Sequence, residues 1–221
     1  LRSIPAVLQT LFAQMQASTV QSISTEALTQ SFGWESKHVV QQHDVQELNR
    51  VLFHAFEKKK HKLEVVKQLY SGKFVSKIKC TRCGKVNGIE EEFYDITLTV
   101  TKSLEDSLAE YCRIEEMKGA DQYECESCNK VDAEKWISIR APPDIIQFSL
   151  NRFSYDWKKG TREKIDMEMS FPVDGLDLTK FTENPALDSL GNLYDLFGVI
   201  IHDGSPYAGH YHCLLRDTLK E

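Results

Sequence analysis

Val-Ile-Ile-His-Asp-Gly-Ser-Pro-Tyr-Ala-Gly-His-Tyr-His-Cys-Leu-Leu, residues 199–215, is the stretch with the clearest pattern in the chain. Two apolar runs, Val199–Ile201 and Tyr211–Leu215, flank a segment interrupted by Gly204, Pro206 and Gly209. This pattern predicts two strands joined by a turn. His210 begins the second strand, directly after a glycine that lets another backbone or a ligand approach closely. A histidine there is a candidate general base, because its pKa lies near neutrality; a structural or surface histidine is the alternative.

The composition is that of a globular protein: 221 residues, 41% hydrophobic and 27% charged, with a formal net charge of −6. A chain of this length can bury one large hydrophobic core, so we expect a single domain. We also expect a monomer. The negative charge disfavours nucleic-acid binding, and no apolar run reaches membrane-spanning length, so neither nucleic acid nor a membrane is an expected partner. The sequence does not begin with Met and carries no secretory signal, so we expect it to be cut from something longer.

Four of the six cysteines form two pairs of identical spacing: Cys80 with Cys83, and Cys125 with Cys128. A tight turn carrying Cys-x-x-Cys directs both sulfurs to one tetrahedral position, so two such turns supply four thiolate ligands for structural Zn²⁺. The long interval between the pairs predicts that they lie at the tips of separate hairpins. Disulfides are the alternative, but nothing indicates a secreted chain, and we expect a cytoplasmic or nuclear location where thiols stay reduced. The remaining Cys112 and Cys213 are predicted to be small buried apolar residues.

The spacing of apolar residues changes along the chain. Helical periodicity occurs in several separate segments between Ser3 and residue 70. From Gly72 onward alternation predicts strands, at Phe74–Cys80, Phe93–Val100, Trp136–Ile139 and Ile145–Phe153. Ser103 stands where a helix N-cap is expected, with Asp106 at the partner position of a capping box. Helices first and strands afterwards predict an α+β fold.

Short motifs make the sequence resemble a known family. They are Gln-His-Asp-Val-Gln-Glu-Leu at 42–48, Leu-Asn-Arg-Phe at 150–153 and Gly-His-Tyr at 209–211. In this order and setting they resemble the ubiquitin-specific proteases, over essentially the whole chain. The branch of the herpesvirus-associated deubiquitinase is similar in sharing Ser31–Trp34 and His43–Leu48. The resemblance implies a papain-like cysteine protease fold, with a helical thumb at 1–70, β-rich fingers carrying the zinc knuckles at 72–140, and a β-sheet palm at 141–221.

The same resemblance implies roles for individual residues. His210 is the general base, and Gly209 and Tyr211 line the channel for the C-terminal tail of ubiquitin. Asp44 lies in the motif that meets the arginines of that tail, a fitting role for a carboxylate beside a basic peptide; capping its own helix is the alternative. The implied activity is that of a deubiquitinase, a thiol-dependent isopeptidase whose partners are ubiquitin and ubiquitinated proteins.

Two parts that the family requires do not occur among these residues. The family nucleophile lies in an Asn-x-Gly-x-Thr-Cys-Tyr-type box, and a downstream Asp or Asn orients the histidine; neither is found here. Cys213 alternates onto the strand face opposite His210, so it is not expected to be the nucleophile. We expect this sequence to be part of a larger active protease. The alternatives are a pseudo-enzyme that binds ubiquitin without cleaving it and a zinc-stabilised scaffold with no ubiquitin role.

Overall fold

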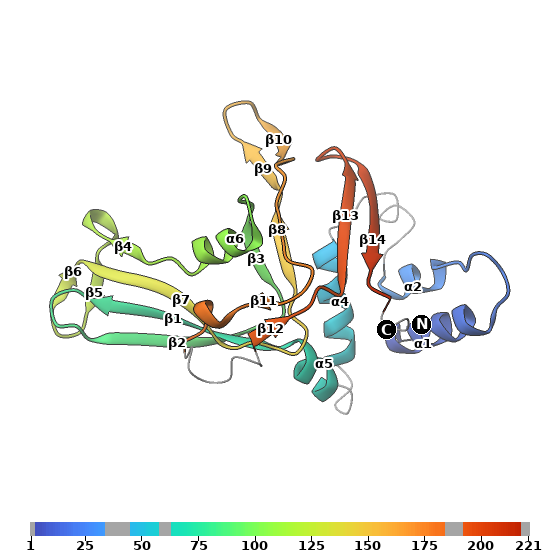
Figure 1. The fold of residues 1–221 in the computed structure, drawn as a ribbon, viewed down its shortest axis with the longest axis horizontal. Helices are drawn as coiled ribbons and strands as arrows, with labels where there is room; N and C mark the ends of the chain where they lie inside the picture. The colour runs from blue at the N-terminus through green and yellow to red at the C-terminus, as the bar shows by residue number, and fades with distance from the viewer. Residues whose placement is uncertain (1–2, 34–44, 58–62, 184–191, 218–221) are drawn as a thin grey trace. The chain divides into compact units, whose positions relative to one another are not determined.

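The computed structural model describes residues 3–33, 45–57, 63–183 and 192–217. The chain forms two compact units, residues 1–68 and 69–221 (Figure 1). Helices dominate the described part of the first unit, and the second unit is built mainly of strands. The prediction of a chain with helices first and sheets afterwards is therefore confirmed. The further division into thumb, fingers and palm stays a prediction.

The first unit contains α1 (Ile4–Ala17), α2 (Glu26–Ser31) and α4 (Val45–Glu57), and α1 packs against both other helices. Pro5 lies in the first turn of α1, where its missing N–H is not needed. Val7 is buried in this helix, whereas Phe12 and Met15 are exposed. A further helix, α5 (Leu63–Tyr70), leads into the second unit. Among the described helices, none combines the length and apolarity needed to cross a bilayer.

The largest sheet of the second unit has four antiparallel strands in the order β2-β1-β7-β4. They are β1 (Gly72–Cys80), β2 (Val86–Phe93), β7 (Ala133–Ala141) and β4 (Glu115–Met117). A small hairpin, β5 (Tyr123–Cys125) with β6 (Asn129–Val131), lies beyond one end of this sheet (Figure 1). A short 3-10 helix, Gly119–Asp121, separates β4 from β5.

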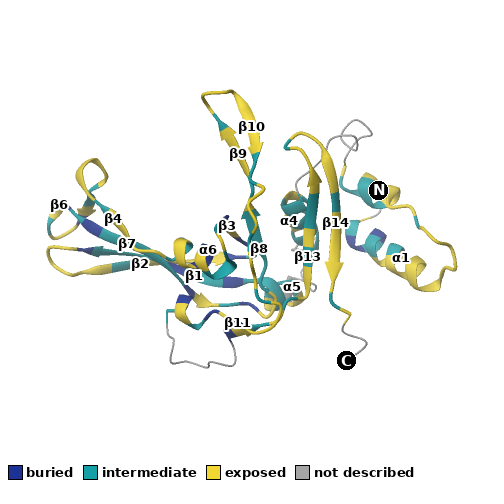
Figure 2. Cartoon of the chain, turned by 45° about the horizontal axis from the view of Figure 1, so that its top comes forward, coloured by how far each residue is buried: buried dark blue, intermediate teal, exposed yellow. Residues whose placement is uncertain are grey.

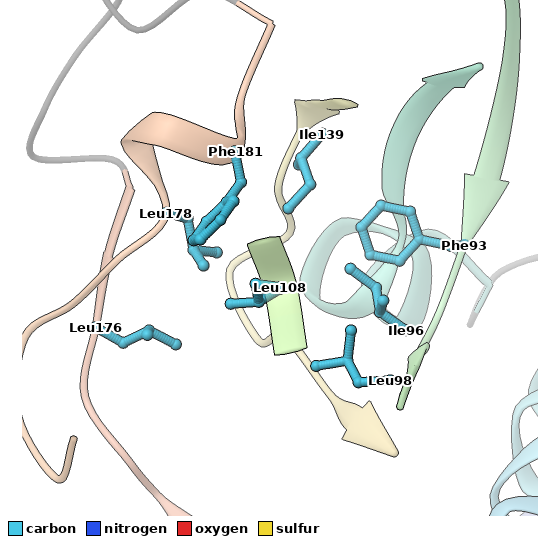
Figure 3. Packing of buried hydrophobic residues seen from close by; sticks show 8 residues of the cluster. All are labelled: Phe93, Ile96, Leu98, Leu108, Ile139, Leu176, Leu178 and Phe181. Carbon is cyan, nitrogen blue, oxygen red and sulfur yellow. The ribbon is translucent and has the colours of Figure 1, made fainter. Parts of the chain in front are cut away.

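The main core of the second unit lies between the sheet, one helix and a parallel strand pair. Strands β3 (Ile96–Thr99) and β8 (Phe148–Asn151) pair in parallel, and α6 (Leu104–Tyr111) packs on β3. Ser103 caps α6 by accepting the Asp106 N–H at 3.0 Å, as predicted. Figure 3 shows the buried cluster, which contains Phe93, Ile96, Leu98, Leu108, Ile139, Leu176, Leu178 and Phe181. Of the last three, Leu176 lies in β11 (Leu176–Asp177), Phe181 in the 3-10 helix Thr179–Phe181, and Leu178 between these two elements.

Two exposed hairpins complete the second unit. The first joins β9 (Phe153–Asp156) to β10 (Thr161–Lys164), and we call it the support hairpin. The second joins β13 (Gly198–Gly204) to β14 (Gly209–Leu215), and we call it the His210 hairpin. Figure 2 shows that most residues of both are exposed or half-buried. A two-residue strand, β12 (Leu193–Tyr194), pairs with β11.

The predicted strands were correct in place but not in extent. Strand β2 was not predicted, because Glu90–Glu92 interrupts any apolar alternation. It pairs with β1 along its whole length, and Lys73 forms an ion pair with Glu90 across the two strands at 2.8 Å. The predicted strand Phe93–Val100 divides, with Phe93 ending β2 and Ile96 beginning β3. The predicted strand Ile145–Phe153 divides at Arg152, between β8 and β9.

Candidate functional site

The four paired cysteines meet at one point, which we call the cysteine cluster. Cys80 and Cys83 lie in the turn from β1 to β2, and Cys125 and Cys128 in the turn from β5 to β6. All four sulfurs lie within 4.8 Å of one another, and the Cys83 and Cys125 Sγ atoms are 3.9 Å apart. Sulfurs at about 2.3 Å from a tetrahedral centre are separated by about 3.8 Å. The prediction that two separate hairpins bring the pairs together is confirmed, and the donor set can hold a metal ion.

Backbone geometry forms each cysteine turn. Gly84 and Asn129 follow the two pairs with φ of 73° and 57°, the left-handed conformation that Gly and Asn tolerate best. The Cys83 N–H points to the Cys80 sulfur at 3.5 Å, as in a turn that prepares a thiolate. Thr81 links the first turn to the residue after β6, because both its N–H and its hydroxyl donate to the Asp132 carbonyl, at 3.1 and 2.6 Å.

The electrostatics of the cysteine cluster favour negative charge at one sulfur. The Cys83 N–H lowers the pKa of the Cys80 thiol to about 6, whereas burial raises the pKa of Cys128 to about 12. Without a cation, a thiolate at Cys80 leaves Cys128 protonated. A divalent cation removes this conflict, because it stabilises every thiolate that contacts it. The arrangement therefore suits a structural metal better than a reactive thiol.

His210 lies on β14, directly opposite Asp203 of β13. Its side chain is exposed, as are those of Asp203 and His212. His210, Asp203 and His212 share one face of the His210 hairpin by strand alternation. Nδ1 of His212 is 3.2 Å from a carboxylate oxygen of Asp203. The face therefore presents two imidazoles and one carboxylate to solvent.

Hydrogen bonds and close packing fix the backbone of the turn before His210. Ser205 donates its N–H to the Ala208 carbonyl at 2.8 Å, and its hydroxyl accepts the N–H groups of Tyr207 and Ala208. A Cβ atom on Gly209 would collide with the Asp203 carbonyl and lie 2.5 Å from Nε2 of His202. The close backbone approach predicted for this glycine is confirmed, and the approaching groups belong to β13.

The other candidate residues fall in different surroundings. Tyr211 is half-buried, and its ring lies 4.8 Å from that of His202 on the opposite face from His210. Asp44 lies outside the described residues. Cys213 is exposed, so its predicted burial is wrong; two strands alone cannot cover both of their faces. Cys112 follows α6 and is half-buried, and burial raises its pKa to about 11.

Sequence reasoning missed two residues of this site, Asp203 and His202. Both are on β13, and their proximity to His210 depends on the register of the hairpin rather than on spacing in the sequence. The signal was present in the turn length, since a four-residue loop closed by Gly204 and Gly209 sets Asp203 opposite His210.

Comparison with known proteins gives a consistent result. The family model described as ubiquitin carboxyl-terminal hydrolase matches residues 2–221. The chain is 40% identical to human ubiquitin carboxyl-terminal hydrolase 40 over 98% of its length, and 36% identical to ubiquitin C-terminal hydrolase 12 of Arabidopsis thaliana over 99%. It is 34% identical to ubiquitin carboxyl-terminal hydrolase 15 of Schizosaccharomyces pombe over 97%. The chain spans only 18%, 20% and 19% of these three relatives. On this similarity the chain belongs to the ubiquitin-specific protease family of ubiquitin carboxyl-terminal hydrolases.

Proposed function

We propose that the protein is a deubiquitinase in which His210 is the general base. The observation that carries this proposal is the placement of His210 in a chain of this family: an exposed imidazole at the start of β14, behind a turn built to bring backbone close. A general base must reach the substrate, and the exposed side chain of His210 meets this requirement. The substrate class is a protein carrying ubiquitin in isopeptide linkage.

The reaction requires a thiol that His210 can deprotonate. The thiolate attacks the carbonyl carbon of the C-terminal glycine of ubiquitin, and His210 then protonates the leaving lysine amine. Water hydrolyses the resulting thioester and restores the thiol. None of the six cysteines here suits this role: four form the cysteine cluster, Cys112 is half-buried, and Cys213 alternates away from His210. We therefore infer that the nucleophile is a further cysteine of the complete protein, and that this chain is one part of its catalytic domain.

The fold of this catalytic domain is proposed to be papain-like, with thumb, fingers and palm at 1–70, 72–140 and 141–221. Gly209 and Tyr211 line the channel for the ubiquitin tail, and Asp44 pairs with the arginines of that tail. Replacing Asp44 by Arg should weaken ubiquitin binding, more strongly at low salt, because it reverses a charge that attracts the tail. Calorimetry checks this against Glu124→Arg, an equal charge reversal at an exposed position of β5. Equal affinities of the two variants would remove Asp44 from the tail site.

The cysteine cluster is proposed to hold one structural Zn²⁺. Four sulfur donors at tetrahedral separation favour Zn²⁺ over Mg²⁺ or Ca²⁺, which prefer oxygen. The metal would join the β1–β2 turn to the β5–β6 hairpin and take no part in the reaction. A monomeric protein of the cytoplasm or nucleus remains our proposal for its state and location.

Two substitutions test the assignment of His210 in the full-length protein. Hydrolysis of a fluorogenic ubiquitin C-terminal amide should fall at least about a thousandfold in His210→Ala, because the base that activates the thiol is lost. His212→Ala is the matched control, since it removes an exposed imidazole from the same strand face, and it should keep activity within about threefold. Equal losses in the two variants would contradict the assignment.

A second candidate function is binding of ubiquitin without cleavage. It is favoured by the positions of the six cysteines, of which none is suited to act with His210. A ubiquitin probe with a C-terminal electrophile separates the two functions. A deubiquitinase forms a covalent adduct with it, whereas a pseudo-enzyme retains ubiquitin only reversibly.

A further inference from the structure

A lysine of the support hairpin bonds to the His210 hairpin. Lys164, the last residue of β10, donates from Nζ to the His202 carbonyl at 2.8 Å and to the Gly204 carbonyl at 3.1 Å. Its side chain is only 16% exposed, and among the described residues the carboxylate paired with its Nζ is that of Asp166, which is 4.0 Å away and 81% exposed. The two carbonyl acceptors lie on β13, immediately before the turn that leads to His210.

Further contacts link the same two hairpins. The Arg162 N–H donates to the Tyr207 hydroxyl at 2.9 Å, which ties β10 to the turn itself. The Phe153 ring of β9 meets the His202 ring edge-on at 5.4 Å. Every contact reaches β13 or the turn, so the support hairpin touches the chain just ahead of His210. The side chain of His210 remains exposed.

The base of the support hairpin is itself anchored. Nη1 of Arg152 donates to the carbonyls of Ile165 and Met167, each at 2.9 Å, and the Ile165 N–H donates to the Arg152 carbonyl at 2.7 Å. Arg152 therefore holds the chain directly after Lys164. A lysine that starts from a fixed backbone loses less conformational freedom when its ammonium binds two carbonyls.

We propose that Lys164 is a positioning residue for His210. It acts on His210 through the turn, by fixing the two β13 carbonyls that precede the turn. Catalytic rates depend on placement of the base to within a fraction of an ångström, and a two-stranded hairpin alone does not provide that precision. The inference rests on the proposed function of His210, and it adds a residue that lies outside the motifs of the sequence.

The first experiment examines the turn and needs no turnover. In Lys164→Met, amide exchange at Ser205 and Ala208, followed by NMR, should become about tenfold faster, and the His210 ring signals should move. Lys164→Arg keeps a cationic donor and should remain within about threefold of wild type. Lys159→Met is the matched control, because Lys159 bonds only Asp156 and Glu163 within the support hairpin. If Lys164→Met behaves as Lys159→Met does, the inference is wrong.

The second experiment measures turnover of the ubiquitin C-terminal amide by the full-length protein. Lys164→Met should lower kcat about tenfold and leave KM within about twofold, because the base is misplaced while the ubiquitin surface is intact. A loss confined to KM, or unchanged kcat despite a loosened turn, would overturn the positioning role. Absence of turnover in the wild-type protein would instead contradict the proposed function, and the exchange and ring-signal results would still decide whether Lys164 holds the turn. Tyr207→Phe removes a separate contact and should give a smaller change of the same kind.

Discussion

The cysteine cluster and the His210 hairpin are both built on turns between antiparallel strands of the second unit, but different forces hold them. The cysteine cluster is held by contacts among its own segments: its four sulfurs lie within 4.8 Å of one another, and Thr81 bonds the first turn to Asp132, directly after β6. The His210 hairpin has few partners of its own. Its strands are mostly exposed, and its turn depends on Lys164 from another hairpin.

This difference fits the two roles that we propose, a structural metal site at the cysteine cluster and a catalytic residue beside the turn of the His210 hairpin. Tight convergence of four donors suits a metal that stays bound, because little rearrangement is needed. In the proposed function a substrate peptide enters and leaves beside His210, and such regions have low local stability by necessity. External support lets the His210 hairpin stay open to solvent and still hold a defined turn.

The largest expected effect is loss of the metal from the cysteine cluster. Cys83→Ser should reduce bound zinc from one per chain to none, removing on the order of 10 kcal/mol of binding free energy. Amide protection should collapse in β5 and β6 and persist in β13 and β14. Elemental analysis and hydrogen exchange measure the two effects, with Cys213→Ser as the control. Loss of protection in both regions would mean that they are not independent.

Thiol reactivity should differ between the two regions by a large factor. In the zinc-loaded protein, iodoacetamide should first modify Cys213, which is exposed in the His210 hairpin. Cys112, which lies in neither region, should react later than Cys213, because burial raises the pKa of its thiol to about 11. Mass spectrometry of the peptides over time gives the order of modification. Early labelling of Cys125 or Cys128 would contradict a metal-bound cluster.

Backbone crowding at Gly209 predicts a moderate effect confined to the His210 hairpin. Gly209→Ala should destabilise it by about 2 kcal/mol, because the new methyl group meets the Asp203 backbone. Gly198→Ala is a matched control at the other end of the hairpin, where the Cβ contact at 2.7 Å is with a Leu215 methyl group that can rotate away. Hydrogen exchange of β14 compares them. Equal destabilisation of the two variants would show that the backbone around residue 209 moves to make room for the methyl group.

The smallest expected effect is a pH dependence of the support hairpin. The N–H groups of Lys159 and Lys158 lower the pKa of Asp156 below the ordinary aspartate value. A carboxyl with a lowered pKa contributes stability that is present above the unfolded-state pKa and lost as pH falls through the folded-state pKa. The turn should therefore loosen only below about pH 4. NMR titration of the Lys158 and Lys159 amides measures this loosening, and Asp156→Asn should give a flat profile. A midpoint above pH 4 would contradict the prediction.

Features that depend on residues close together in the sequence could be predicted, whereas features that depend on residues far apart in the sequence could not. The cysteine cluster was predictable because each Cys-x-x-Cys pair lies within one turn, and the His210 hairpin because its apolar runs flank turn residues. Strand β2 was missed because Glu90–Glu92 carries no apolar pattern and its order depends on pairing with β1. The support from Lys164 was missed because its acceptors are backbone carbonyls 38 and 40 positions away, and every residue carries such a group.

The pairing of β1 with β7 has a consequence for how the chain folds. The ion pair between Lys79 and Glu134 joins residues 55 positions apart, and β1 lies between β2 and β7 in the sheet. During synthesis β1 can pair with β2 early, but its other edge has no partner until β7 has been made. Open strand edges recruit other chains, and pairings between distant segments form slowly. The nascent protein therefore passes through a stage in which the nine-residue edge of β1 is open to aggregation, and this edge closes once β7 has left the ribosome.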